Sequence, residues 1–407
     1  MRTRRYFALG TCVLGLAVAA TLGGPPQSAG QKPAPMMTKP SAAPNFQATA
    51  RMIVNEAVQV KENEGVLITG DATKIPLMEA IAVEVAKKGG FPHLVLESPE
   101  VAKRVLTECS PTYLSTPNQM TIAEIKHTNV QISLSSVEDP TYLAKVPEER
   151  VALVRKASQA VTEALYSRPM RTVSLGNPMM PSAGIARFYG VPLADMEARF
   201  WEAVNTPPAT IAENGRKVKE ALASGREIHI QTQAGTDLRF KLAGRKVTLA
   251  DGQIHNPPVD KPEQVWLPAG EVFTAPDAST VNGTVFVPLA EYRGNKIKDL
   301  KLTFQGGKVT KIEAAQNAEV LKEALAKSAG DKDLFSFIDI GVNPNSRMMK
   351  SSDYCTYEMG GMVTMGIGQA PWLDCPNQSD FAQEFFIPRA TVEVDGRVIV
   401  RDGTIQI

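Results

Sequence analysis

One short segment of this sequence places a carboxylate where it could do chemistry. Glu271 follows Gly270 and precedes Val272-Phe273, and Pro268 and Pro276 bound the segment. A carboxylate between a glycine and an apolar pair, in a proline-bounded loop, is fixed in position rather than free in solvent. Fixed carboxylate oxygens are what a hard metal ion requires, although composition alone also fits a solvated loop.

Histidine, the other common ligand and proton carrier, is scarce in this chain. The 407 residues contain four histidines, at positions 93, 127, 229 and 255. None follows residue 255, so the C-terminal part cannot supply an imidazole to a metal or a proton relay. A histidine-based site built from that part is therefore excluded.

Four motifs stand out in the sequence: LPAGEVFTAP at 267–276, GTDLRF at 235–240, GVNP at 341–344 and VDG at 394–396. Together they resemble the metallo-aminopeptidase family typified by aminopeptidase T and aminopeptidase S. The resemblance covers roughly residues 46–407. It implies a two-domain homodimer that removes N-terminal residues from peptides with two divalent metals in the second domain. It also implies a ligand set of two glutamates, two histidines and an aspartate, with a tyrosine nearby.

Carried over residue by residue, the resemblance keeps few of these ligands. Glu271 stands at the first glutamate, and Phe337 stands at the second. Asp339, two residues further on, shares a strand face with position 337 and is a shorter carboxylate that could reach in. Thr364 stands at the first histidine.

The last three positions also differ from the family pattern. Ala382 stands at the second histidine, Glu384 at the aspartate, and Pro371 at the tyrosine. We therefore predict that any metal site consists of Glu271, Asp339 and Glu384. Three carboxylates suit Mg²⁺, Mn²⁺ or Ca²⁺ better than Zn²⁺, and the alternative is that no metal binds.

Two readings of the function follow from the resemblance. In the first, the protein is a peptidase, a hydrolase with a degenerate metal site. In the second, it is a non-catalytic relative that binds peptides or has a structural role. Both place a peptide or small-molecule ligand in the cleft between the domains.

Residues near this region are expected to have ordinary structural roles. Tyr354, Tyr357 and Glu358 are interpreted as solvated loop residues. Cys355 and Cys375 are a possible disulfide, and buried thiols are the alternative.

Hydrophobic patterning predicts an α/β N-terminal domain at 45–215 and an α+β C-terminal domain at 216–407. The first domain alternates helix and strand, with apolar strands at 66–69 and 93–96 and a helix at 75–88 between them. That order favours a parallel sheet with flanking helices. From residue 226 the pattern changes to short strands with glycine turns.

The start of the sequence is typical of an exported protein. Arg2, Arg4 and Arg5 precede an apolar stretch, which predicts a secretory signal peptide at 1–23. The Arg4-Arg5 pair also resembles a twin-arginine signal, which is the alternative export route. A Pro/Ala-rich linker follows at 24–44. We expect a periplasmic or secreted protein with no transmembrane segment after cleavage. The formal charge of +1 gives no basic excess for nucleic acid.

Overall fold

The computed structural model describes residues 45–134, 139–141, 143, 146–176, 180–242, 244–260, 262–349, 352–370, 372–373 and 375–407. The predicted signal peptide at 1–23 and linker at 24–44 lie outside these residues, as does Pro371. Among the described helices, none is both long enough and apolar enough to cross a membrane.

A parallel sheet of five strands forms the first layer, in the order β2-β1-β3-β4-β8. Its strands are β1 (Gly65–Gly70), β2 (Phe91–Leu96), β3 (Val130–Leu134), β4 (Arg171–Leu175) and β8 (Glu263–Leu267). The predicted strands at 66–69 and 93–96 are β1 and β2, which pair in parallel. The α/β class expected for this part of the chain is confirmed. Strand β8 lies beyond residue 215, so the chain returns to this sheet after the predicted boundary.

Helices cover this sheet and lead toward the second part of the molecule. They are α1 (Phe46–Met52), α2 (Ile75–Lys87), α3 (Pro99–Glu108), α4 (Pro111–Leu114), α5 (Gln119–His127), α6 (Glu148–Tyr166), α7 (Ala183–Tyr189), α8 (Leu193–Val204) and α9 (Pro208–Ser224). A π-helical turn (Ile53–Ala57) continues α1, and a 3₁₀ turn (Ala72–Lys74) precedes α2.

The sequence sets where α7 ends and α8 begins. The Ser182 side chain accepts a hydrogen bond from the Ile185 N–H at the start of α7, and Gly190 ends this helix with φ 67°. Pro192 then precedes α8, whose buried face carries Met196 and Phe200.

The second part of the chain forms two antiparallel sheets. The larger has the order β12-β11-β10-β6-β5-β16-β17-β18. Its strands are β5 (Glu227–Gln231), β6 (Asp237–Leu242), β10 (Pro276–Tyr292), β11 (Asn295–Gln305), β12 (Lys308–Glu313), β16 (Thr391–Val394), β17 (Arg397–Arg401) and β18 (Thr404–Ile405). Helix α10 (Ala318–Lys327) packs beside β11 and β12.

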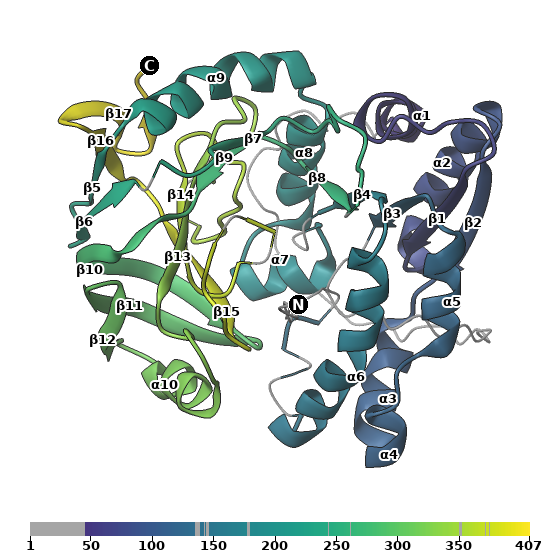
Figure 1. Ribbon diagram of the computed structural model, residues 1–407, viewed down its shortest axis with the longest axis horizontal. Coiled ribbons are helices and arrows are strands. Elements are labelled where there is room, and N and C mark those ends of the chain that lie inside the picture. The colour runs from purple at the N-terminus through teal and green to yellow at the C-terminus, as the bar shows by residue number, and fades with distance from the viewer. Residues whose placement is uncertain are drawn as a thin grey trace, which may run out of the picture.

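The smaller antiparallel sheet has the order β15-β14-β13-β9-β7. Its strands are β7 (Thr248–Ala250), β9 (Glu271–Thr274), β13 (Phe335–Gly341), β14 (Val363–Gly368) and β15 (Ala382–Ile387). Strand β10 of the larger sheet packs against β13 and β15. In Figure 1 the parallel sheet lies on the right, the antiparallel sheets lie on the left, and α7 and α8 lie between them. The expected α+β class of this part is confirmed.

Candidate functional site

The smaller antiparallel sheet brings the three predicted metal ligands to neighbouring strands. Glu271 is the first residue of β9, Asp339 lies in β13, and Glu384 lies in β15. The expectation that Glu271 belongs to a loop was wrong, because Val272 and Phe273 pair with Ile340 and Asp339 of β13. Backbone pairing to β13, rather than proline alone, holds this carboxylate in place.

The strand register puts these carboxylates on one face of the sheet. Gly341 is opposite Glu271, and Asp339 is opposite Thr364. Glu384 is opposite Gly366, two residues from Thr364. Because side chains in a strand alternate with a period of two, Glu271, Asp339, Thr364 and Glu384 all point to the same side.

A fourth carboxylate, Glu358, reaches this face from the loop that precedes β14. The carbonyl oxygens of Tyr357 and Met359 lie 2.4 and 2.1 Å from where a Cβ on Gly341 would stand. Only glycine at 341 therefore lets the loop lie directly on the sheet, beside Glu271. The Asn343 N–H donates to the Glu358 carbonyl oxygen at 3.0 Å and fixes the loop there.

Glu358 was interpreted from sequence as a solvated loop residue, and that interpretation was wrong. Its side chain is 6% exposed. Its Oε1 accepts hydrogen bonds from Ser346 Oγ at 2.8 Å and Thr356 Oγ1 at 2.7 Å. Tyr354 is also buried, against Tyr189. No local pattern marks either residue, because their burial comes from the loop packing on a distant strand.

Burial raises the pKa values of all four carboxyl groups, and neighbouring carboxylates add to the shift at Glu271 and Asp339. Burial, with a contribution from Glu358, raises the pKa of Glu271 to about 8. Burial also raises the pKa of Asp339 well above its ordinary value, and the charges of Glu271 and Glu358 add to the shift. Burial raises the pKa values of Glu358 and Glu384 as well. None of the ion pairs between described residues includes any of the four.

Within the described part of the chain, two polar atoms on this face have no hydrogen-bond partner. They are Oδ1 of Asp339 and Oγ1 of Thr364, which belong to directly opposed residues of β13 and β14. Asp339 is 1% exposed and Thr364 is fully buried. Such atoms are uncommon in folded proteins and call for an explanation in function or strain.

Aromatic side chains occupy the adjoining part of the same face. The ring of Phe337 lies over Gly366, since its Cε1 atom is 2.2 Å from where a Cβ on that glycine would stand. Trp372 contacts both Phe337 and Phe273, with ring centroids 5.0 and 4.9 Å apart. Trp266 joins the same group. Phe337 therefore packs over the glycine that faces Glu384.

The residues present do not fit the two-metal centre that the family resemblance implies. Among the described residues, no group of three or more histidine, cysteine, aspartate or glutamate side chains is arranged to hold a metal ion. Phe337, which the resemblance aligns with a ligand glutamate, presents an aromatic ring, and Glu358 Oε1 accepts hydrogen bonds from two hydroxyl groups. The set Glu271, Asp339 and Glu384 shares a face but stays a prediction as a metal site.

The structure also distinguishes between the two interpretations of Cys355 and Cys375, a disulfide or separate thiols. Cys355 is a buried free thiol, so the possible disulfide with Cys375 is absent. Burial raises the pKa of Cys355 to about 12, which makes it a poor nucleophile near neutral pH.

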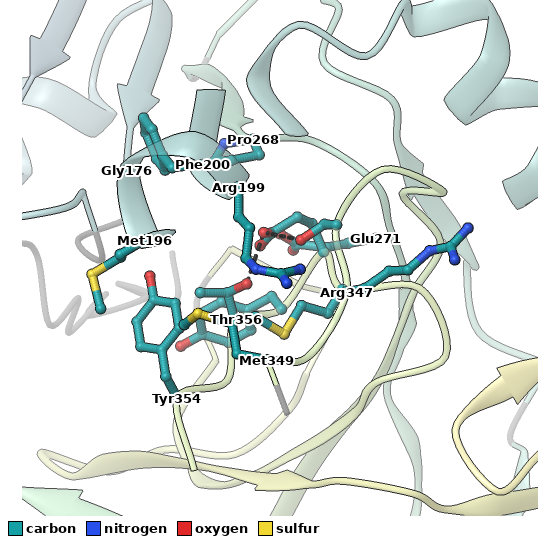
Figure 2. A pocket seen from close by; sticks show the side chains of 14 residues that line it. Gly176, Met196, Arg199, Phe200, Pro268, Glu271, Arg347, Met349, Tyr354 and Thr356 are labelled. Carbon is teal, nitrogen blue, oxygen red and sulfur yellow. Dashed lines mark hydrogen bonds between the residues drawn. The ribbon is translucent and has the colours of Figure 1, made fainter. Parts of the chain in front are cut away.

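A pocket opens beside the carboxylates, between α8 and the loops of the second part. The space among its lining residues is about 520 Å³ with open solvent included, and the centres of water-sized molecules can occupy about 30 Å³ of it. Glu271 and Glu358 line one side. Apolar side chains line much of the rest: Met196, Phe200, Met349 and Met359. Figure 2 shows Arg199 reaching from α8 toward the middle of this pocket.

Asn343 ties α8 to the segment that carries Glu271. It is fully buried, and its Nδ2 donates to the carbonyl oxygens of Ala203 at 3.1 Å and Ala269 at 2.7 Å. Its Oδ1 accepts from Thr206 Oγ1 at 3.0 Å. Ala203 lies near the end of α8 and Ala269 directly before Gly270, so this one side chain positions both walls of the pocket.

Comparison with known proteins places these features in a family context. A sequence model of the family described as thermophilic metalloprotease (M29) matches residues 42–337. Aminopeptidase T of Thermus aquaticus is 24% identical over 318 residues, which cover 71% of this chain and 76% of that protein. Aminopeptidase AmpS of Bacillus subtilis (strain 168) is 33% identical over 105 residues, a quarter of each chain.

A solved structure shares the fold. The wild-type AmpT structure from Thermus thermophilus superposes with a TM-score of 0.72 and 19% sequence identity. The match covers 89% of this chain and 99% of the other. At this identity the likeness concerns the fold, and the chemistry of the site must be argued from the residues in it.

Proposed function

Because this chain belongs to the thermophilic metalloprotease (M29) family, we propose that its pocket binds the amino-terminal residue of a peptide. The protein is a relative of aminopeptidases in which the metal centre of the family is degenerate. The observation that carries this proposal is the pair of buried carboxyl groups, Glu271 and Glu358, on one wall of the pocket.

A protonated amine is the natural partner for this wall. Buried carboxylates are costly unless they are paired with a cation or protonated. A peptide ammonium carries three donors and one positive charge, and charge-assisted hydrogen bonds to carboxylates are strong. None of the ion pairs between described residues brings a positive charge to these carboxyl groups. The ammonium group of a bound peptide would supply that charge.

The loss of the metal centre is supported by three substitutions. Phe337, Thr364 and Ala382 stand where the family pattern has a glutamate and two histidines. The Phe337 ring packs on Gly366 and Trp372, so the position is filled rather than empty. An aromatic ring and two uncharged side chains cannot replace anionic and imidazole ligands.

Calorimetric titration of the purified chain with leucyl-leucine and with its N-acetyl derivative tests the proposal. We expect saturable binding of the free peptide and at least tenfold weaker binding of the acetylated one. Glu358→Gln should weaken binding of the free peptide, whereas the exposed control Glu220→Gln should bind like the wild type. Equal affinity for the two peptides would overturn the proposal.

A second function, peptide-bond hydrolysis, is favoured by the unpartnered Asp339 Oδ1 and Thr364 Oγ1. A single hard cation held by Glu271, Asp339 and Glu384 would satisfy such oxygens and would polarise a peptide carbonyl. Assays with aminoacyl-amides, with and without added Mn²⁺, Co²⁺ or Zn²⁺, decide between the two functions. Turnover that is lost in Glu271→Ala would establish hydrolysis.

We also propose that the protein is exported to the periplasm or secreted. Support comes from the basic residues Arg2, Arg4 and Arg5 before an apolar stretch. Fractionation of cells that express the full chain should find the shortened protein outside the cytoplasm. Replacement of both Arg4 and Arg5 by lysine should make the protein accumulate in the cytoplasm if the twin-arginine route is used.

We propose a homodimer by family analogy. Edge strand β2 exposes Phe91, Leu94 and Leu96, and an exposed apolar edge is a common site of association. Light scattering should give twice the mass of one chain. A single-chain mass at micromolar concentration would contradict this proposal.

A further inference from the structure

Methionine side chains gather in and around the pocket, and the proposed peptide binding does not account for their number. Five of the chain's 15 methionines lie between residues 348 and 365, where a uniform distribution would place fewer than one. Met349, Met359 and Met362 of this segment pack in one buried cluster with Met196 of α8. Thioether groups from two distant parts of the sequence therefore lie together in the fold.

Three of these methionines border the pocket itself. Met196 lies on α8, and Met349 and Met359 lie in the segment between β13 and β14. Figure 2 shows Met196 and Met349 among the side chains that line the pocket from different elements. The centres of water-sized molecules can occupy about 30 Å³ here, and about 10–15 Å³ is enough for one water molecule. The space therefore accepts a guest of the size of a single ion.

The sulfur of methionine selects a particular class of ion. Thioether sulfur is a soft ligand that favours Cu(I), whereas Mg²⁺, Mn²⁺ and Ca²⁺ favour carboxylate and carbonyl oxygens. A thioether has no proton to lose, so it binds a metal ion without deprotonation. Each methionine has three rotatable side-chain bonds, so sulfur atoms on facing walls can adjust to one ion. The methionines thus offer a metal chemistry that the carboxyl groups do not.

The other groups near the methionines are compatible with a single positive charge. Cys355 lies in the same cluster but is not one of the described residues that line the pocket, so the ligands are thioethers. Glu271 and Glu358 border the pocket and can offset a buried cation. Arg199 also borders it, but its side chain is exposed, so solvent and salt screen its charge.

We propose that Met196, Met349 and Met359 form a binding site for one soft monovalent cation, of which Cu(I) is the natural example. The site differs from the hard-cation site considered above, because its ligands are sulfur atoms rather than carboxylate oxygens. It also needs no histidine, which the chain lacks beyond residue 255.

Titration with Ag⁺, a soft ion that is not readily oxidised or reduced, tests the proposal. The protein carries ¹³C at its methionine methyl groups, and cysteines other than Cys355 are replaced by serine because accessible thiols bind silver themselves. We expect saturation at one Ag⁺ per chain, with the methyl signals of Met196, Met349 and Met359 shifting together. Leucine variants assign these signals, since leucine nearly conserves the volume of methionine.

Two leucine variants separate the site from the rest of the core. Met359→Leu should bind Ag⁺ at least tenfold more weakly than the parent protein. Met78→Leu, at a buried methionine of α2, should bind within twofold of it. Matching thermal unfolding of both variants without silver shows that the fold is unchanged, and Met349→Leu replaces Met359→Leu if the latter unfolds.

Three results would overturn the proposal. The first is that Ag⁺ leaves the three methyl signals in place. The second is an affinity that Met359→Leu does not change, including the case in which Cys355→Ala abolishes binding and so assigns it to the thiol. The third is an equal response of the three signals to Mg²⁺, which would assign the binding to the carboxyl groups.

Discussion

Thr364 and Thr356 place the same hydroxyl group in two different environments near the site. Thr364 Oγ1 is buried in β14 without a partner, whereas Thr356 Oγ1 donates to Glu358 at 2.7 Å. A buried polar group without a hydrogen bond costs about 1–3 kcal/mol, while a satisfied one contributes about 0.5–1.5 kcal/mol. The two residues therefore offer a matched pair of substitutions.

We predict that Thr364→Val raises the free energy of unfolding by about 1 kcal/mol. Valine has the same shape, suits a strand, and removes the unpaired oxygen. Thr356→Val should instead lower the free energy of unfolding by about 1–2 kcal/mol, because it takes a donor from a buried carboxyl group. Urea denaturation measures both. Destabilisation by Thr364→Val would show that its hydroxyl has a partner in solution.

The raised pKa of Glu271 predicts how stability depends on pH. The pKa is about 8 in the folded protein, against about 4.3 for glutamate in an unfolded chain. Between these values the folded state binds the proton more tightly. This contribution to stability is therefore complete below about pH 4.3 and is lost as the pH rises toward 8.

Urea denaturation at several values between pH 5 and 8, after treatment with a chelator, checks this prediction. The free energy of unfolding of the wild type should fall more steeply with pH than that of Glu271→Gln, by up to about 1.4 kcal/mol per pH unit. Asp339 and Glu358 have raised pKa values too, so the variant keeps part of the slope. The exposed Glu220→Gln serves as the control, and parallel slopes for wild type and Glu271→Gln contradict the prediction.

At the scale of the element, the contact between β13 and β14 depends on a missing side chain. A Cβ on Gly366 would lie 2.2 and 2.6 Å from Phe337 Cε1 and Cδ1, and 2.7 Å from Ser336 Oγ. Gly366→Ala should therefore lower the free energy of unfolding by about 1–3 kcal/mol through overpacking. In the Phe337→Ala variant the contacts with the Phe337 Cε1 and Cδ1 atoms are absent.

A double-mutant cycle on these two residues measures the contact directly. We expect Gly366→Ala to cost at least about 1 kcal/mol less when Phe337 is alanine than in the wild type. Thermal or urea unfolding of the four proteins gives the coupling. Strict additivity would show that the Phe337 ring does not lie over the glycine.

Elements with local signals were predictable from sequence. Short apolar runs predicted β1 and β2, and the helix predicted at 75–88 is α2, whose buried face includes Leu77, Ile81 and Val85. Strand β9 was read as a loop because its pairing with β13, more than 60 residues away, leaves no trace in four residues. The place of β8 in the parallel sheet is non-local for the same reason.

Residues of the candidate site could be predicted only where a sequence motif or the two-residue period of a strand indicated them. Glu271 came from its motif, and Asp339 from its period-two relation to position 337 in β13. Glu358 was missed because its burial follows from Gly341 allowing the loop to lie on the sheet. Arg199 was missed because α8 meets the second part of the chain only through tertiary contacts such as those of Asn343.

At the scale of the whole molecule, the fold is that of the family, and our proposal is that the chemistry of its site differs. The buried Asn343 joins α8 to the segment before Glu271, and a pocket lies between the two parts of the chain. Carboxyl groups, methionines and an arginine line the pocket, and by the resemblance Thr364 and Ala382 stand at the family's histidine positions. On the proposed account, such a frame binds a ligand without the family's metal ligands.

The most direct test is calorimetric titration of leucyl-leucine into the purified chain before and after dialysis against a chelator, with the bound metal counted by mass spectrometry. We predict fewer than about 0.1 divalent ions per chain and a dissociation constant that the chelator changes by less than about twofold, since a twofold change is only about 0.4 kcal/mol. One or two ions per chain, with peptide binding lost on chelation, would contradict the account.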